Sequence, residues 1–476
     1  MPSSQPEVEQ RDVLVLGSGE AGKYIAWTLA ASGKKTALIE RRYIGGSCPN
    51  IACLPSKNVV YSAQVAHTAT LAASFGLHPA EPGVDMSVVR DRKRSMVDGL
   101  VKMHENRFHQ SGTELILGNG HFVAPKTIEV ALNSGGSRTL SAEHVIISTG
   151  SRATIADIPG LAESQPLTHI EALELGKLPE HLIILGGGYV GLEFAQAFRR
   201  FGSRVTIVDH NARLLPREDD DIVEALTQIL LSEGIEILTD AEVTQVKGRS
   251  GAHVTLDIDR AGAKIELTGT HILAATGRTP NTDGIGLEKA GVALTSRGFV
   301  QVNERLETTA PQVFAVGDCA GSPHFTHIAF DDFRIVRETL AGRTRVTTGR
   351  LVPSCLFVDP ELAHVGLNEW EARQKGIAYR LAKLPMEAVL RTRTTGETQG
   401  FLKALISIGN DTILGFTAFG ARAGELMAPV QLAMSAGLPY TALRDSIFTH
   451  PTFSEGLVYL FSSKLTEVPA GSSRNT

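Results

Sequence analysis

An apolar run near the start of the chain predicts a buried strand that leads into a helix. The run is Val13–Leu16, and the turn after it carries three glycines in a G-x-G-x-x-G pattern, Gly17, Gly19 and Gly22. A second strand-like stretch, Lys35–Glu40, ends in an acid. A strand, a glycine turn, a helix and a second strand with a terminal acid are typical of a dinucleotide-binding unit. Its glycines admit a pyrophosphate to the helix N-terminus, and its acid accepts hydrogen bonds from a ribose.

The same pattern recurs in the middle of the chain. The apolar run His181–Leu185 opens into Gly186, Gly188 and Gly191, and the next strand-like stretch ends in Asp209. Glu40 follows Gly17, and Asp209 follows Gly186, at the same interval of 23 residues. We therefore predict an α/β protein with two Rossmann-like dinucleotide-binding domains. FAD and a nicotinamide cofactor are the simplest pair for two such sites, because hydride transfer is the chemistry that joins them.

Stretches with proline and glycine divide the chain into domains. Asp157–Leu161 is expected to lead into the second unit, and Thr276–Asn281 to return from it. After Gly349, strand-like and helical stretches alternate in a way that predicts a separate α+β domain. The predicted division is a discontinuous FAD domain of residues 1–155 and 281–348, an NAD(P) domain of residues 156–280 and a C-terminal domain of residues 349–476.

Composition narrows the possible partners. The 476 residues carry a net charge of −5 and only 6% aromatic residues, which argues against nucleic acid and anionic membranes as partners. The first ten residues are polar and acidic, so no signal peptide is expected, and no apolar run is long enough for a membrane span. We expect a cytoplasmic protein, and in that reducing compartment a close pair of cysteines is more often catalytic or metal-binding than structural.

Such a pair occurs in the segment Gly45–Lys57, which reads GGSCPNIACLPSK and contains Cys48 and Cys53. A helix can begin after Cys53, so the helix N-terminus and Lys57 are expected to lower the thiol pKa values. A zinc site is one alternative, but it needs about four ligands. Buried, unreactive thiols are the other alternative. The remaining cysteines, Cys319 and Cys355, are isolated in the sequence and receive no predicted role.

Together with the two glycine turns, GSGEAG and GGGYVGLEF, this segment resembles the class I pyridine nucleotide–disulfide oxidoreductases. The resemblance runs from about Val13 to about Lys464 and implies that the C-terminal domain is a dimerisation domain. Further motifs of the family stand in its order at Ser148–Gly150, Ala275–Arg278, Val316–Asp318, Asp359–Gly366 and His450–Glu455.

The resemblance implies roles for individual residues. Cys53 would face the flavin as a thiolate, and Cys48 would exchange with substrate. Lys57 would lie near the flavin and pair with Glu193, and Tyr189 would cover the flavin until the nucleotide displaces it.

The same resemblance implies that His450, oriented by Glu455, is an acid/base that serves the partner subunit's site. The enzyme would then be an obligate homodimer, and the bond before Pro451 would be cis.

The cofactor contacts are implied in the same way. FAD would touch Gly17, Gly19, Gly22, Glu40, Gly46, Ser47, Lys57, Gly120, Thr149, Gly150, Asp318 and Ala329. The nicotinamide nucleotide would touch Gly186, Gly188, Tyr189, Gly191, Asp209 and Gly277. Asp209 favours NADH over NADPH because a carboxylate accepts hydrogen bonds from a free 2′-hydroxyl and repels a 2′-phosphate. Arg204, Arg213 and Arg217 could soften that preference. No metal site is expected.

The acceptor stays open between a small disulfide and a metal ion. Phe325–Val336 and Leu215–Asp219 resemble the reactive-chlorine-resistance branch of the family, which is often labelled mercuric-reductase-like and is linked to metal-ion reduction and oxidative stress. Dihydrolipoamide dehydrogenase is an alternative, although Ala52 replaces its usual glycine. A non-catalytic flavin redox sensor is the alternative of another class.

Overall fold

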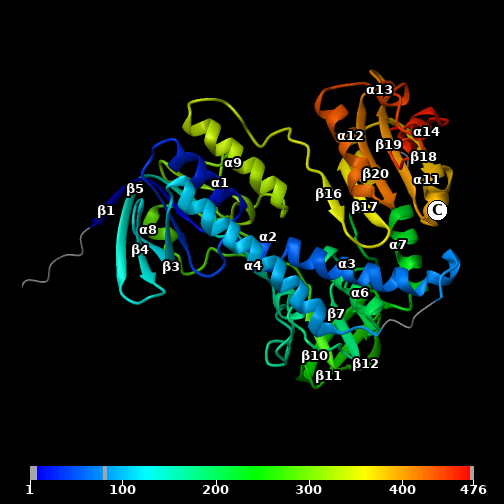
Figure 1. The fold of residues 1–476 in the computed structure, drawn as a ribbon, viewed down its shortest axis with the longest axis horizontal. Coiled ribbons are helices and arrows are strands. Elements are labelled where there is room, and N and C mark those ends of the chain that lie inside the picture. Colours follow the sequence, from blue (N-terminus) through cyan, green and yellow to red (C-terminus); the bar gives the residue numbers. More distant parts are fainter. Residues whose placement is uncertain (1–7, 79–82, 472–476) are drawn as a thin grey trace, which may run out of the picture.

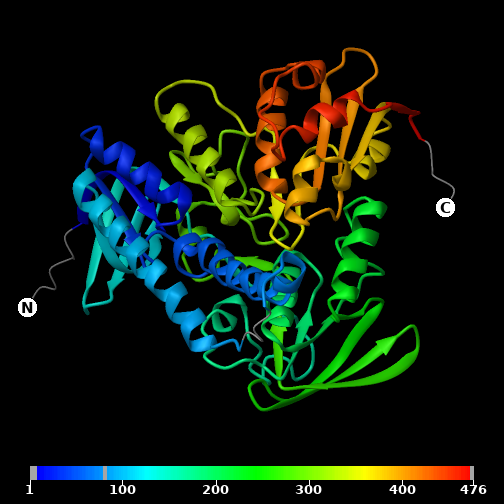
Figure 2. The ribbon, with the colours of Figure 1, turned by 45° about the vertical axis from the view of Figure 1, so that its right-hand side comes forward.

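The three largest β-sheets of the described residues lie one in each predicted domain. The computed structural model describes residues 8–78 and 83–471, and Figures 1 and 2 show its ribbon from two directions. No helix in these ranges is both long and apolar enough to cross a membrane. Most of the polar N-terminal segment, and with it the prediction that no signal peptide is present, lies outside the described residues.

The first sheet unites segments from both parts of the predicted FAD domain. Its strands are β1 (Val8–Leu16), β2 (Thr36–Glu40), β3 (Glu114–Ala124), β4 (Thr127–Leu132), β5 (Ser137–Ile147) and β15 (Val313–Ala315). β1 pairs in parallel with β2 and β5, and β15 pairs in parallel with β5. The chain thus leaves this sheet after β5 and returns to it at β15.

Both faces of β1 are covered, which explains its continuous apolar run. Val13 and Val15 pack into one core cluster, and Leu14 and Leu16 into another on the opposite face. α1 (Glu20–Ala31) begins directly after the glycine turn and packs against α4 (Met86–Ser111) and α9 (Thr326–Leu340). The helix predicted after the first motif is confirmed.

The second sheet is entirely parallel and carries the repeated motif. Its order is β13 (His271–Ala274), β7 (His181–Leu185), β8 (Arg204–Val208) and β9 (Glu236–Leu238). α6 (Tyr189–Phe201) follows the second glycine turn, and α7 (Asp220–Ser232) follows β8. An antiparallel ribbon of β10 (Ala241–Arg249), β11 (His253–Arg260) and β12 (Ala263–Gly269) lies at the edge of the molecule (green in Figure 2). Both predicted dinucleotide-binding units are therefore present.

Two short strands connect the first two domains. β6 (Ser151–Ala153) carries the chain out of the first sheet, and β14 (Arg278–Pro280) pairs antiparallel with it on the way back. α5 (His169–Ala172) lies after the outgoing crossing, and α8 (Leu287–Ala290) after the return. Among the described residues, short 3-10 helices lie after α3 at Ala72–Phe75, after β15 at Gly317–Ala320 and, in the C-terminal domain, at Met386–Ala388.

The C-terminal domain is an antiparallel sheet with helices, as predicted. Its strand order is β16 (Ser354–Leu356), β17 (Glu361–Gly366), β20 (Ile413–Gly420), β19 (Phe401–Ser407), β18 (Tyr379–Pro385) and β21 (Thr466–Val468). Its helices are α10 (Glu369–Gln374), α11 (Leu390–Thr395), α12 (Ala423–Ser435), α13 (Thr441–Arg444) and α14 (Gly456–Ser462).

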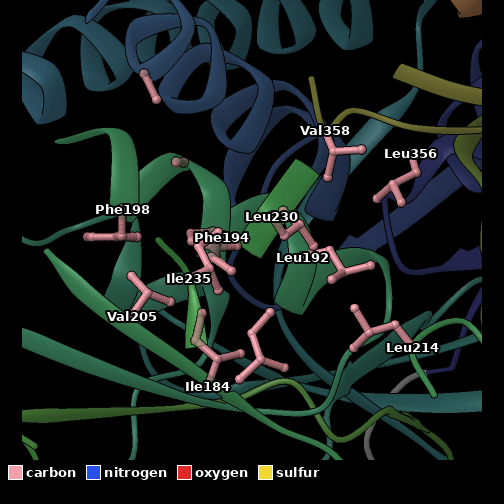
Figure 3. Close-up of a cluster of buried hydrophobic side chains, with 14 of the residues drawn as sticks. Ile184, Leu192, Phe194, Phe198, Val205, Leu214, Leu230, Ile235, Leu356 and Val358 are labelled. Carbon is pink, nitrogen blue, oxygen red and sulfur yellow. The ribbon is translucent and has the colours of Figure 1, made fainter. Parts of the chain in front are cut away.

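An apolar core joins the second sheet to the C-terminal domain. Figure 3 shows Leu192 and Leu230, from α6 and α7, with Leu356 and Val358 of the C-terminal domain in the same cluster. Leu192, Leu230 and Leu356 are fully buried. Because this core continues across the junction, the two domains pack as neighbours and not as separate bodies on a linker.

A buried charge cluster lies at the same junction. Lys403 of β19 is fully buried, and its Nζ lies 2.6 Å from Asp219, 2.9 Å from Asp221 and 3.1 Å from Glu369. The two aspartates come from the start of α7 in the nucleotide domain, whereas Lys403 and Glu369 come from the C-terminal domain. Asp219 also accepts a hydrogen bond from the backbone N–H of Trp370 at 2.9 Å. The cluster, called here the Lys403 cluster, links the two domains through ion pairs and a hydrogen bond.

Candidate active site

The first glycine turn opens on a cavity of about 810 Å³. Many residues predicted to contact FAD line it: Gly17, Gly19, Glu40, Gly46, Ser47, Gly120, Thr149 and Gly150. Gly22, Lys57, Asp318 and Ala329 are not part of this lining. Asp318 nevertheless borders it, because its carboxylate accepts a hydrogen bond from the hydroxyl of Ser151, which is a lining residue.

The backbone around this cavity has no room for a side chain at Gly17 or at Gly46. Gly17 has φ +100°, and a Cβ added there would lie 2.3 Å from the carbonyl oxygen of Ser148. A Cβ added at Gly46, where φ is +84°, would lie 2.5 Å from Cα of Gly19. These close approaches bring three backbone segments together at the N-terminus of α1, where a pyrophosphate group fits.

The acid of the first motif is bound to the same segments. Glu40 is buried and accepts hydrogen bonds from the backbone N–H of Ser18 at 2.9 Å and of Arg42 at 2.8 Å. The hydroxyl of Ser18 donates to Glu40 at 2.7 Å and accepts from the N–H of Gly45 at 2.9 Å. The glycine turn therefore holds the start of the cysteine segment in place.

Sequence reasoning missed several residues of the cavity lining, and His169 is one of them. His169 lines it, is buried, and has a ring Nε2 without a hydrogen-bond partner among the described residues. Burial, with the nearby charge of Arg278, lowers the pKa of His169 to about 4, so its ring is neutral. A buried ring nitrogen without a partner fits a polar cofactor group in the cavity. No local motif marks this position, which α5 supplies from the outgoing crossing.

The second glycine turn repeats the arrangement of the first. Asp209 is buried, and its carboxylate accepts the N–H of Gly187 at 2.6 Å and the N–H and side-chain amide of Asn211, each at 2.8 Å. Glu40 and Asp209 thus bind the corresponding N–H of their glycine turns. A Cβ at Gly191 would lie 2.0 Å from the carbonyl oxygen of Gly186, so α6 also starts close to its strand.

The predicted pair of Lys57 and Glu193 is present. Lys57 Nζ lies 2.6 Å from Glu193 Oε2, and Glu193 is buried while Lys57 is partly exposed. Lys57 belongs to α3 (Cys53–Thr70) and Glu193 to α6, and these two helices pack together. The other oxygen of Glu193 accepts the backbone N–H of Phe357 at 3.0 Å. Glu193 therefore touches all three domains, and its contact to Phe357 was not foreseen from the sequence.

The cysteines lie on two consecutive helices. Cys48 is in α2 (Ser47–Asn50), and Cys53 is the first residue of α3, as the sequence predicted for the helix. Both are free thiols and half-buried, and each thiol influences the pKa of the other through a shared hydrogen bond. The Sγ of Cys53 also lies 3.1 Å from the hydroxyl oxygen of Thr326.

The expectation that both thiols have lowered pKa values is wrong for Cys48. The hydrogen bond from Cys48, aided by Thr326 and Lys57, lowers the pKa of Cys53 against the opposing effect of burial. The same hydrogen bond raises the pKa of Cys48, and burial raises it further. Two adjacent thiols cannot both be deprotonated at little cost, so one becomes the thiolate and the other donates to it.

The C-terminal histidine and glutamate form the predicted dyad. His450 Nδ1 lies 2.9 Å from Glu455 Oε2, and the peptide bond between His450 and Pro451 is cis. Hydrogen bonds from Tyr459, Thr452 and His450 lower the pKa of Glu455 despite the opposing effect of its burial. The side chain of His450 is 65% exposed. Figure 1 shows α14, which follows the dyad, well separated from α2 and its Cys48.

Tyr189 is the first residue of α6 and is half-buried. Burial raises its pKa, so the phenol is neutral. Its ring centroid lies 6.4 Å from that of Phe325, the residue before α9. Tyr189 thus stands between the second glycine turn and the segment that touches Cys53.

Nearly the whole chain is similar to known proteins. Residues 11–332 match the model of the pyridine nucleotide-disulphide oxidoreductase family, and residues 352–461 match the model of its dimerisation domain. The probable pyridine nucleotide-disulfide oxidoreductase RclA of Escherichia coli is 36% identical over 94% of this chain and 98% of that protein. A dihydrolipoyl dehydrogenase of Thermus scotoductus is 35% identical over 94% of this chain and 96% of that protein. A mercuric reductase of Streptomyces lividans is 34% identical over 94% of each chain.

A solved structure has the same fold. It is a Cu(II) complex of a cysteine variant of RclA, described as an HOCl-induced flavoprotein disulfide reductase from Escherichia coli. Its TM-score is 0.88 at 35% sequence identity, over 96% of this chain and 99% of that one. The glycine turns, the cavity and these matches agree. The chain therefore belongs to the pyridine nucleotide-disulphide oxidoreductase family, whose members are flavoprotein oxidoreductases that bind FAD and use NAD(P)H.

Proposed function

We propose that this protein is a homodimeric, NADH-dependent disulfide reductase whose redox centre is Cys48 and Cys53. The observation that carries the proposal is the position of the two thiols. They follow Gly46 and Ser47, which line the FAD cavity, and Cys53 starts a helix packed against the helix of the second glycine turn. The pair therefore lies where the two cofactor-binding units meet.

The proposed reaction balances in electrons and protons. NADH and one proton supply two electrons and two protons to a disulfide, which gives NAD⁺ and two thiols. FAD, when bound, relays the electron pair from the nucleotide to the protein. Cys53 is the thiolate that faces the flavin, and Cys48 is the thiol that exchanges with substrate. Lys57 and Glu193 hold the two cofactor-binding domains together at this point, and Tyr189 covers the nucleotide side.

NADH is the proposed donor because Asp209 directly follows β8 and no lysine or arginine among the described residues pairs with it, although the ring Nδ1 of His210 lies 3.7 Å from its carboxylate. Arg204 pairs with Glu236 at 2.8 Å, and Arg213 donates to the backbone oxygen of Glu218 at 2.7 Å. Both of these arginines are engaged elsewhere, which leaves the carboxylate to reject a 2′-phosphate.

We propose that His450 and Glu455 complete the partner subunit's site. The support is the exposure of His450, its separation from α2 in the same chain, and the match to the dimerisation domain. Glu455 orients the imidazole of His450, so the other ring nitrogen can take a proton from a thiol or return one to a thiolate.

We also propose the division of the chain into three domains, residues 1–155 with 281–348, residues 156–280 and residues 349–476. The three largest sheets support it.

The acceptor is proposed to be a small disulfide, with a metal ion as second candidate. A small disulfide is proposed as the acceptor because the cysteine pair can exchange with it and the His450–Glu455 dyad can transfer the proton. The metal ion is favoured by the similarity to RclA, whose Cu(II) complex has been solved, and to mercuric reductase.

An anaerobic titration of the FAD-loaded protein with NADH tests the proposal. A long-wavelength charge-transfer band between thiolate and flavin is expected, followed by turnover of at least one of lipoamide, glutathione disulfide, other small disulfides, Cu(II) or Hg(II). A folded, FAD-loaded protein that shows neither the band nor turnover would contradict the proposal and support a redox sensor instead.

A further inference from the structure

A threonine far from the cysteine segment in sequence contacts its thiolate-forming member. Thr326 is the first residue of α9, and its Oγ1 lies 3.1 Å from the Sγ of Cys53, 273 residues away in the chain. Thr326 lies in the segment Phe325–Val336, which resembles one branch of the family, but none of the roles assigned above involves its hydroxyl. A hydroxyl donates a hydrogen bond to a thiolate, and a hydrogen bond to a charged acceptor is stronger than one between neutral groups.

The neighbours of Thr326 fix its position. The ring of His327 stacks on Phe325, with centroids 5.2 Å apart, and its Nε2 lies 2.8 Å from the carbonyl oxygen of Pro353. Burial lowers the pKa of His327, so its ring is neutral and donates to that oxygen. On the other side, Phe325 packs against Tyr189. Thr326 is therefore held from both sides, by the segment that precedes β16 and by the nucleotide domain.

Several groups surround Cys53, and they differ in what they can do. Cys48 of α2 shares a hydrogen bond with it, and Lys57 of α3 contributes a positive charge that Glu193 of α6 partly neutralises. Glu20 of α1 acts on Cys48 and raises its pKa. Thr326 of α9 is the neutral donor of this set, with no charge of its own to titrate. Its hydroxyl lowers the pKa of Cys53, after the larger effects of Cys48 and of burial, and it also lowers the pKa of Cys48. The contact that favours Cys53 is the distance of 3.1 Å between its Sγ and the hydroxyl oxygen of Thr326.

We propose that Thr326 is a positioning residue of the redox centre, whose hydroxyl donates a hydrogen bond to Cys53 and selects that sulfur as the thiolate of the reduced pair. The inference rests on the proposed function, since it assigns a role within the same cysteine centre. Selection matters because only one thiol of the pair is ionised at a time. With the negative charge held on Cys53, Cys48 keeps its proton until an external base removes it.

The test measures the ionisation of Cys53 directly. In a Cys48→Ser background, the rate of alkylation of Cys53 by iodoacetamide is followed against pH, since only the thiolate reacts. The charge-transfer absorbance of the FAD-loaded protein is titrated in parallel. Thr326→Val removes the hydroxyl and keeps the shape. It is expected to raise both midpoints by about one pH unit, which is about tenfold less thiolate below the midpoint.

Three further variants decide between this role and a general structural one. Thr326→Ser restores the hydroxyl and is expected to return the midpoint to the parent value. Thr339→Val, a threonine of the same helix that bonds the carbonyl oxygen of Ile335, is expected to leave the midpoint unchanged. If Thr326→Val does not fold, Thr326→Ala removes the same hydroxyl. An unchanged midpoint in a folded Thr326→Val or Thr326→Ala variant overturns the inference.

The two proposals fail in different ways. Disulfide turnover by the parent decides the proposed function, whereas the alkylation midpoints need neither NADH nor an acceptor. A normal parent turnover with an unchanged midpoint in Thr326→Val overturns only the role of Thr326.

Discussion

At the scale of single residues, Asp209 has two functions that can be separated. Its carboxylate accepts the N–H of Gly187, and its charge meets the nucleotide. Asp209→Asn keeps an oxygen acceptor for Gly187 and removes the charge. We expect the ratio of kcat/KM with NADH to kcat/KM with NADPH to fall by roughly 5- to 150-fold, which corresponds to about 1–3 kcal/mol. Values of kcat/KM with both donors check this, and a parent enzyme that prefers NADPH would contradict it.

The two cysteines should also differ in what their loss removes. Cys53→Ser is expected to bind FAD but to lose both disulfide turnover and the charge-transfer band, because the thiolate is gone. Cys48→Ser should lose disulfide turnover and keep a thiolate beside the flavin. Absorbance spectra of the NADH-reduced variants and a disulfide assay distinguish them. Disulfide reduction at the parent rate by Cys48→Ser would show that the roles are assigned wrongly.

Residues within short motifs could be predicted from the sequence, and residues brought in from elsewhere could not. Lys57 and Glu193 each belong to a motif, so their pairing followed from the resemblance. His169 belongs to no motif, and the segment that contains Thr326 was used only to indicate a branch of the family. Both residues reach the site through the packing of α5 and α9. Cys48 shows a different limit. A sequence gives two thiols near a helix start, but which one donates to the other depends on their three-dimensional arrangement.

At the scale of elements, the helices and strands around the glycine turns were the most predictable part of the fold. β1 and β7 carry the buried apolar runs Val13–Leu16 and Leu182–Leu185 because parallel strands are covered on both faces. The junction between α7 and the C-terminal sheet was not predictable. Asp219, Asp221, Glu369 and Lys403 look like ordinary surface charges in the sequence, and only the fold buries them together.

The Lys403 cluster gives a prediction at this scale. Lys403→Met leaves Asp219 and Glu369 buried without their cation, and we expect a loss of about 3–5 kcal/mol of stability. Lys383 is the matched control. It pairs with Asp221 at 2.5 Å, but its side chain is 40% exposed, so Lys383→Met should cost no more than about 1 kcal/mol. Thermal unfolding of the two FAD-loaded variants measures the difference. Equal melting temperatures of Lys403→Met and Lys383→Met would contradict the conclusion that the Lys403 cluster stabilises the fold more than an exposed ion pair does.

At the scale of the whole molecule, the position of His450 predicts that one active site draws on two chains. His450→Gln should lower disulfide reduction by about 10²- to 10⁴-fold while most activity toward artificial electron acceptors is retained. That difference separates its acid/base role from general damage. Equal disulfide activity in this variant and the parent would refute the role.

Mixed dimers test the sharing itself. A dimer of one Cys48→Ser chain and one His450→Gln chain has one site with both changes and one site with neither, if His450 serves the partner. Such a dimer should recover about half of the parent's turnover, although each variant alone is inactive. Two differently tagged chains, expressed together and purified through both tags, provide it. No recovery in a stable mixed dimer would mean that each chain uses its own His450.

The Lys403 cluster also bears on how this chain can be recombined with its relatives. The nucleotide domain supplies Asp219 and Asp221, and the C-terminal domain supplies Lys403 and Glu369. A chimaera that takes its C-terminal domain from a homologue without a lysine at this position would leave the buried Asp219 and the half-buried Asp221 without the cation between them. A working chimaera therefore has to exchange the residues of the cluster in both domains together. The two domains should accordingly be replaced as a pair and not one at a time.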